Sequence, residues 1–118
     1  MKWFLVKYIY EIISGVGNYK AQFDEQMRLV KALSVGDAFG KAERMAQQLH
    51  LPFTNQKGET VQWKFLGIAD LYEIDRPDDG AEVSSTVHEP ADVKSFLDFV
   101  DKRKMYLMNR LDNTELQL

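Results

Sequence analysis

The sequence predicts a single α+β domain with a mainly antiparallel sheet that carries two helices on one face. Long runs at residues 2–13 and 61–74 are rich in aromatic and β-branched side chains, which favour strands. Two other segments have apolar residues three and four positions apart, which is typical of amphipathic helices. Turn-forming residues separate these segments, so the expected order is strand, strand, helix, strand, strand, helix.

The first strand is expected over residues 2–13. Its even positions are all apolar or aromatic, and its odd positions mix apolar and charged residues. A strand that is apolar on both faces is usually central in its sheet. The chain is expected to reverse at residues 14–18, which include Gly15 and Gly17. Residues 20–32 fit both a helix and a strand with one mostly polar face, and we favour a strand because it would pair with the first one.

A helix is expected to begin at Ser34, which is an N-cap residue type, with Asp37 three positions on. Its apolar positions recur three and four residues apart as far as Leu49, so they share one face. Pro52 prevents any continuation, because proline lacks an amide donor and clashes with the preceding turn.

A long, bent strand is expected over residues 61–74. Its first residues alternate between apolar and polar types, and the alternation breaks at Gly67, which indicates a bulge. Residues 53–60 are expected to form a turn with a short hairpin arm before it. A reversal over residues 75–80 then leads to a further strand, expected at residues 81–88.

The second helix is expected to begin at residues 89–92, with Pro90 near its first turn. Its apolar stripe is interrupted by Lys104. The domain is expected to span residues 1–112, and residues 113–118 are expected to be a frayed tail. The stripe consists of Val93, Phe96, Leu97, Val100, Leu107 and Leu111.

Composition narrows the classes of function. The chain has 118 residues, a formal net charge of −3 and no cysteine. Cysteine-based catalysis, disulfides and zinc–thiolate sites are therefore excluded, and nucleic-acid binding is disfavoured. No apolar run reaches the roughly 20 residues that span a bilayer. The first residues do not resemble a secretory signal, so we expect a cytoplasmic protein.

No motif for catalysis, metal binding or a cofactor stands out, so no catalytic residue, metal or cofactor is predicted. His50 follows a helix, where a histidine is commonly a surface residue. His88 and Glu89 lie at a strand-to-helix junction, where sites do occur, but adjacent strand residues point to opposite faces. Glu73, together with the acidic residues of the 75–80 turn, is more simply read as a solvated turn than as a cation site.

Aromatic residues are concentrated on the two long strands. Two helices can cover only one face of a sheet, so some of these residues are expected to be exposed, although completion of the core explains them equally well. An exposed aromatic face could bind a protein or stack bases. The candidate binding residues are Trp3, Tyr8, Tyr10, Trp63, Tyr72, His88 and Glu89.

Four stretches of the sequence resemble a bacterial family known as domain of unknown function 4288. They are residues 1–7, 22–29, 55–65 and 79–82. The resemblance implies a small bacterial α+β protein and a strand over residues 21–31. The family offers no activity or catalytic residues to transfer.

We therefore expect a non-enzymatic binding module that acts through an aromatic sheet face or edge, as a homodimer or with a protein partner. One alternative is a small enzyme or ligand-binding protein that uses His88, Glu89 and a carboxylate such as Glu73. A weaker alternative is binding of single-stranded RNA.

Overall fold

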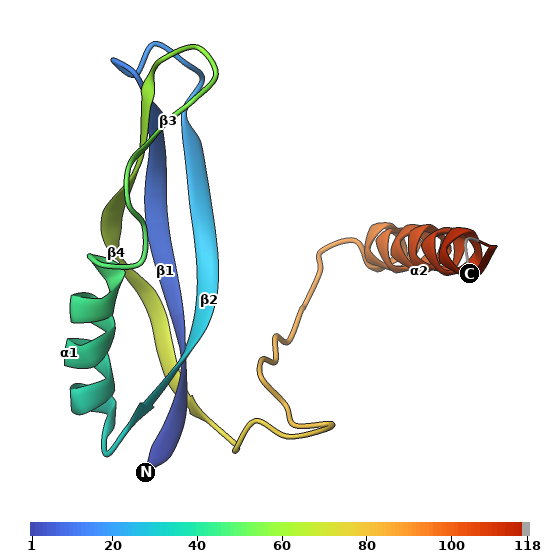
Figure 1. Ribbon diagram of the computed structural model, residues 1–118. Coiled ribbons are helices and arrows are strands. Elements are labelled where there is room, and N and C mark those ends of the chain that lie inside the picture. The colour runs from blue at the N-terminus through green and yellow to red at the C-terminus, as the bar shows by residue number, and fades with distance from the viewer. Residues whose placement is uncertain (117–118) are drawn as a thin grey trace. The chain divides into compact units, whose positions relative to one another are not determined.

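The computed structural model of the protein describes residues 1–116 (Figure 1). The chain forms two compact units, Met1–Ser85 and Thr86–Leu118, and each is described here by itself. The predicted α+β class and the order of strands and helices are confirmed. The prediction of one domain over residues 1–112 stays a prediction.

The first unit is built on a four-stranded antiparallel sheet with the strand order β2-β1-β4-β3. The long β1, Lys2–Ser14, lies in the centre, as its apolar faces predict. It pairs with β2, Gln22–Ala32, which confirms the strand expected over residues 20–32. On its other side it pairs with β4, Thr60–Ile74. The expected hairpin arm is the short β3, Phe53–Thr54.

Strand β4 carries the predicted irregularity. Its register against β1 shifts between Lys7 and Tyr8 and again between Ile9 and Tyr10. Ala69 and Leu66 are the extra residues that have no opposite partner at these two shifts. Because of the bulges, Phe65 and Ile68 lie on the same face as their partners Tyr10 and Tyr8. These apolar residues of β4 therefore share one face even though the alternation in the sequence is broken.

Helix α1, Val35–Ala46, packs on one face of this sheet (Figure 1). Its predicted N-cap is confirmed, because the backbone N–H of Asp37 donates to Ser34 Oγ at 3.2 Å. The helix buries three alanines, Ala38, Ala42 and Ala46, one turn apart. Small side chains on this face let the helix backbone approach the sheet closely. The core lies between them and the even-numbered residues of β1.

The strand predicted over residues 81–88 is wrong. This segment contains no strand in the structure. Its β-branched residues Val83, Thr86 and Val87 favour extended backbone, but a strand also needs a partner to complete its hydrogen bonds. Neither of the hydrogen bonds described for this segment pairs it with a strand backbone: the Ala81 N–H donates to the Asp78 carbonyl at 2.9 Å, and the Tyr72 hydroxyl donates to the Val83 carbonyl at 3.1 Å. The fourth strand of the sheet is β3 instead.

The second unit contains helix α2, Val93–Leu116. It begins just after the predicted start at residues 89–92 and continues past residue 112. Residues 113–116 of the predicted tail are therefore helical, and residues 117–118 lie outside the described residues. The placement of this helix on the same sheet face as α1 stays a prediction.

Candidate interaction surface

Two of the predicted binding residues, Tyr8 and Tyr10, lie in the core beneath α1. Their side chains are almost completely buried, and their hydroxyls donate to the Ala42 and Ala46 carbonyls at 2.8 and 3.0 Å. Burial raises the pKa of both hydroxyls, so they remain neutral donors. These tyrosines fasten the helix to the sheet and are not available to a partner.

Trp63 belongs to a polar and aromatic cluster on the same face, close to the end of α1. Its indole N–H donates to Asp24 Oδ2 at 3.0 Å, and its ring stacks on His50 with centroids 5.5 Å apart. Gln26 lies between the charged groups: its amide nitrogen donates to Asp24 at 2.7 Å, and its amide oxygen accepts from Arg28 at 3.0 Å. The Nε2 atom of His50 lies 2.9 and 3.1 Å from the two amide atoms of Gln26.

This cluster is internally satisfied. The hydrogen bonds from Gln26 and Trp63 hold the pKa of Asp24 below its usual range. Sequence reasoning singled out Trp63 but missed Asp24, Gln26 and Arg28. These three residues occupy alternate positions of β2, and this alternation is the sequence signal that they share one face. The register of the hairpin places them on the helix side, opposite Tyr10, Tyr8 and Val6.

The other face of the sheet, which we call the open face, is turned away from α1. No helix or strand of residues 1–85 packs on it, yet most of its positions are apolar. Phe23 is 61% exposed and Leu29 is 42% exposed. Two of the predicted binding residues, Trp3 and Tyr72, lie on this face. Its apolar members are Trp3, Leu5, Ile9, Ile13, Phe23, Met27, Leu29, Tyr72 and Ile74.

Charged residues on the open face balance one another. The ammonium group of Lys7 lies 3.1 Å from a carboxylate oxygen of Glu25, and the ammonium group of Lys31 lies 5.3 Å from the centre of the Trp3 ring. A shallow apolar hollow of about 280 Å³ opens beside Ile9 at the bulges of β4. The face therefore mixes apolar residues with paired charges and is neutral overall. Its charged residues are Lys7, Lys31, Lys64, Glu11, Glu25 and Asp70.

A hollow of about 460 Å³ lies at the end of β4. It is lined by Glu73, by Tyr72 and by several other acidic residues besides Glu73. Glu73 also lies 3.6 Å from the Lys2 ammonium group, and both side chains are exposed. Among the described residues, no group of three or more histidine or carboxylate side chains is arranged to hold a metal ion. The hollow is a solvent-open acidic recess.

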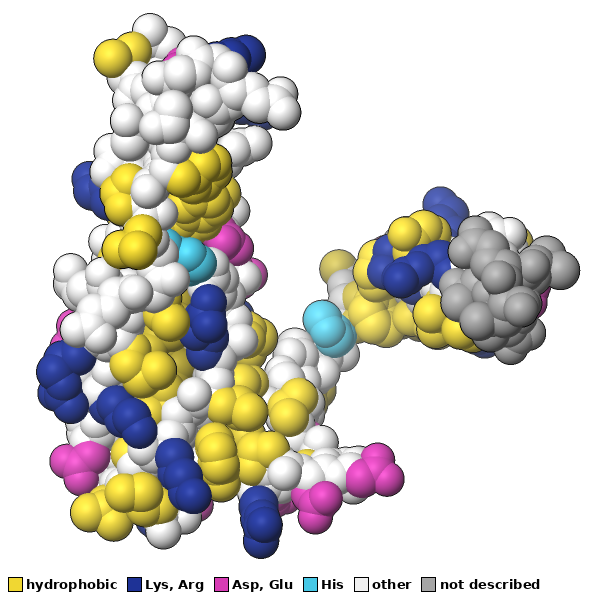
Figure 2. Space-filling model, in the orientation of Figure 1, with side chains coloured by type: hydrophobic (Ala, Val, Ile, Leu, Met, Phe, Trp, Pro, Cys, Tyr) yellow, Lys and Arg dark blue, Asp and Glu magenta, His cyan; other side chains and the backbone are white. Residues whose placement is uncertain are grey.

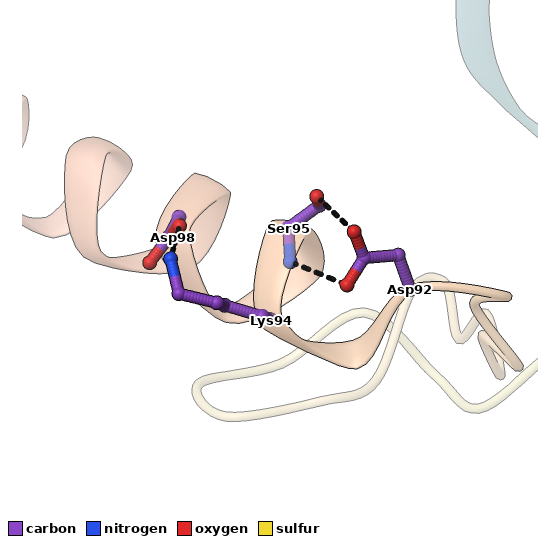
Figure 3. A network of polar contacts seen from close by, with 4 residues as sticks. All are labelled: Asp92, Lys94, Ser95 and Asp98. Atoms are coloured by element: carbon purple, nitrogen blue, oxygen red, sulfur yellow. Dashed lines mark hydrogen bonds and ion pairs between the residues drawn. The ribbon is translucent and has the colours of Figure 1, made fainter.

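His88 and Glu89 precede α2 in the second unit, and both are exposed. The His88 ring contacts Phe96 with centroids 5.2 Å apart. At the start of α2, Asp92 accepts hydrogen bonds from the Ser95 hydroxyl at 2.7 Å and from its backbone N–H at 3.3 Å (Figure 3). His88 and Glu73 belong to different units, and the enzymatic site that the sequence raised as an alternative stays a prediction.

The first unit has the fold of a small α+β protein in which an antiparallel sheet carries helix α1 on one face. The model of a family described as domain of unknown function (DUF4288) matches residues 3–85, and the chain belongs to this family. The match ends at the same residue as the first unit, so α2 lies outside it. A search of curated proteins and a search of solved structures each found no match.

None of the described helices has a stretch long and apolar enough to cross a membrane.

Proposed function

We propose that the protein is a non-enzymatic interaction module that self-associates through the open face of its sheet. The observation that carries this proposal is the contrast between the two faces of one sheet. Tyr8 and Phe4 on the helix side are 0% and 1% exposed, whereas Phe23 and Leu29 on the other side are 61% and 42% exposed. Exposed apolar residues that gather on one face of a small protein typically mark a contact surface.

The charges of the open face support a second copy as the partner. The face carries three lysines and three carboxylates, so two copies can stack without net repulsion. In a twofold arrangement the same patch is used by both copies, and each lysine can lie beside a carboxylate of the other copy. Trp3 and Tyr72 contribute large side chains of the kind enriched in the centre of interfaces.

Binding of single-stranded RNA remains the weaker candidate. The open face offers aromatic rings for stacking, but its charge is neutral and the chain carries −3 overall, so it lacks the excess of cations that attracts phosphates. The cytoplasmic location expected from the sequence stays a prediction.

The mass of the full-length protein in solution tests the proposal. We expect light scattering over a dilution series to show association that Leu29→Arg and Trp3→Ser both weaken. The matched control is Phe39→Arg, because Phe39 on α1 is 43% exposed and Leu29 is 42% exposed, but Phe39 lies outside the open face. An unchanged mass for Leu29→Arg, with circular dichroism showing an intact fold, would rule out this face as the contact.

A further inference from the structure

Helix α2 has an apolar stripe that its own unit does not bury. In residues 86–116 the structure describes no other helix or strand. Leu97, Leu107 and Leu111 are each about half exposed, and apolar side chains are visible along the helix in Figure 2. An isolated helix with this exposure is marginally stable in water, since most helical stability comes from packing an apolar face.

Five of the stripe residues, together with Lys104, follow a heptad pattern, and Phe96 borders that line. Successive members are separated by four, three, four, three and four residues, which is the spacing that keeps a helix seam against a partner helix. Packing against a sheet does not require a seven-residue repeat, whereas packing along a second helix does. We call this seam the α2 stripe; its members are Val93, Leu97, Val100, Lys104, Leu107 and Leu111.

Lys104 is the one charged member, and it selects the orientation of the pair. In a parallel pair equivalent residues face each other, so two Lys104 ammonium groups would meet in the seam. In an antiparallel pair that keeps the whole stripe in contact, Lys104 of one helix lies in the layer of Val100 of the other. Asp101 follows Val100 and borders the stripe. In the symmetric pair, Asp101 of each helix can therefore form an ion pair with Lys104 of the other helix.

We propose that α2 of one chain pairs with α2 of a second copy as an antiparallel two-helix coiled coil, with reciprocal Lys104 and Asp101 ion pairs at its centre. The layers are Val93 against Leu111, Leu97 against Leu107, and Val100 against Lys104. This contact is separate from the open face and does not depend on it, because all of its residues belong to the second unit.

Single cysteines test the orientation directly, because the chain has none of its own. Leu97→Cys and Leu107→Cys are made in the full-length protein and oxidised separately and as a mixture. The antiparallel pair predicts a disulfide-linked dimer in the mixture and none with either variant alone. Each variant cross-linking only with itself would indicate a parallel pair and would overturn the proposal. The control is Met105→Cys, which lies outside the stripe and is expected to cross-link with neither variant.

Two further sets of variants test the seam and its charges, each in a Leu29→Arg background that removes the open-face contact. Leu107→Arg is expected to raise the dissociation constant at least about a hundredfold, since two apolar layers are lost per dimer. Met105→Arg, at a residue 67% exposed and off the stripe, should leave it unchanged.

Asp101→Lys and Lys104→Glu should each weaken association by about threefold to tenfold, and the double variant should restore it. Failure of the restoration, or equal effects at Leu107 and Met105, would overturn the antiparallel seam. Complete loss of association in Leu29→Arg alone would overturn the α2 pair. Association that persists in Leu29→Arg and is lost when Leu107→Arg is added would support it, so the two contacts are tested separately.

Discussion

The two compact units of the chain place similar apolar side chains in very different surroundings. In the first, Tyr8 is completely buried and its hydroxyl is bonded to α1. In the second, Leu107 is 52% exposed, and the described contacts of α2 are local, such as the Asp92 cap and the Lys94–Asp98 ion pair (Figure 3). The first unit is stabilised by contacts between distant parts of the chain, and α2 by neighbours in sequence. Apolar side chains are therefore buried within the first unit, whereas those of α2 stay exposed within the second.

The largest expected effect tests the buried side of this comparison. Tyr8→Ala should lower the free energy of unfolding by about 3–5 kcal/mol, because it leaves a cavity under α1. Tyr8→Phe keeps the ring and should cost about 1 kcal/mol. Urea unfolding followed by tryptophan fluorescence measures both, because Trp3 and Trp63 lie in the sheet. Leu107→Ala should leave this transition in place, and an equally large shift there would contradict the separation of the two units.

Removing the helix caps should affect the two units separately. Ser34→Ala should cost about 1 kcal/mol in the urea transition of the first unit, because the Asp37 N–H loses its acceptor. Asp92→Ala should leave that transition unchanged and should instead reduce the helical signal at 222 nm. The test is to measure both observables on both variants. A loss of tertiary stability with Asp92→Ala would show that the first unit depends on α2.

A smaller effect concerns pH and the cluster around Asp24. Its pKa is lowered in the folded protein, chiefly by Gln26. A depressed carboxyl pKa adds stability above the unfolded value of about 3.9, and this stability is lost as pH falls through the folded pKa. Gln26→Met should move the pKa of Asp24 up toward its ordinary value and weaken this acid dependence. Carbon-detected NMR titration of the Asp24 carboxyl group gives the result, and an unchanged pKa would assign the shift to Trp63 instead.

The smallest expected effect is that of Lys94→Ala. The Lys94 and Asp98 side chains are 85% and 53% exposed, so their 3.1 Å ion pair should contribute less than about 0.5 kcal/mol to α2. The helical signal at 222 nm should fall only slightly, and less than with Asp92→Ala. A larger loss would mean that local ion pairs, not the cap, hold the start of this helix.

The sequence predicted those features that depend on local pattern. Alternation and β-branched residues indicated β1 and β4, Gly67 indicated the bulged region, and Ser34 indicated the start of α1. The segment at 81–88 was misjudged because its local preference for extended backbone was not matched by a partner strand. Local pattern says what a residue favours and not what is available to pair with it.

The candidate surface was only partly predictable for the same reason. Aromatic content indicated that some rings would be exposed, but Trp3 and Tyr8 look alike in sequence until the position of α1 is known. The cluster of Asp24, Gln26 and Arg28 depends on the register of β1 and β2, which no single segment reveals. Together with Trp63 and His50, its residues come from two strands and the segment after α1.

The short β3 has a consequence for solubility. It pairs only with Thr60 and Val61, so the outer edge of β4 beyond them has no strand partner among the described residues. Such an edge is a template on which further chains can add strands and polymerise. The two bulges, at Leu66 and Ala69, interrupt the regular spacing of its amide and carbonyl groups, and charged residues at Lys64, Asp70 and Glu73 oppose dry packing there. The irregularity of β4 therefore also protects the protein against edge-to-edge aggregation.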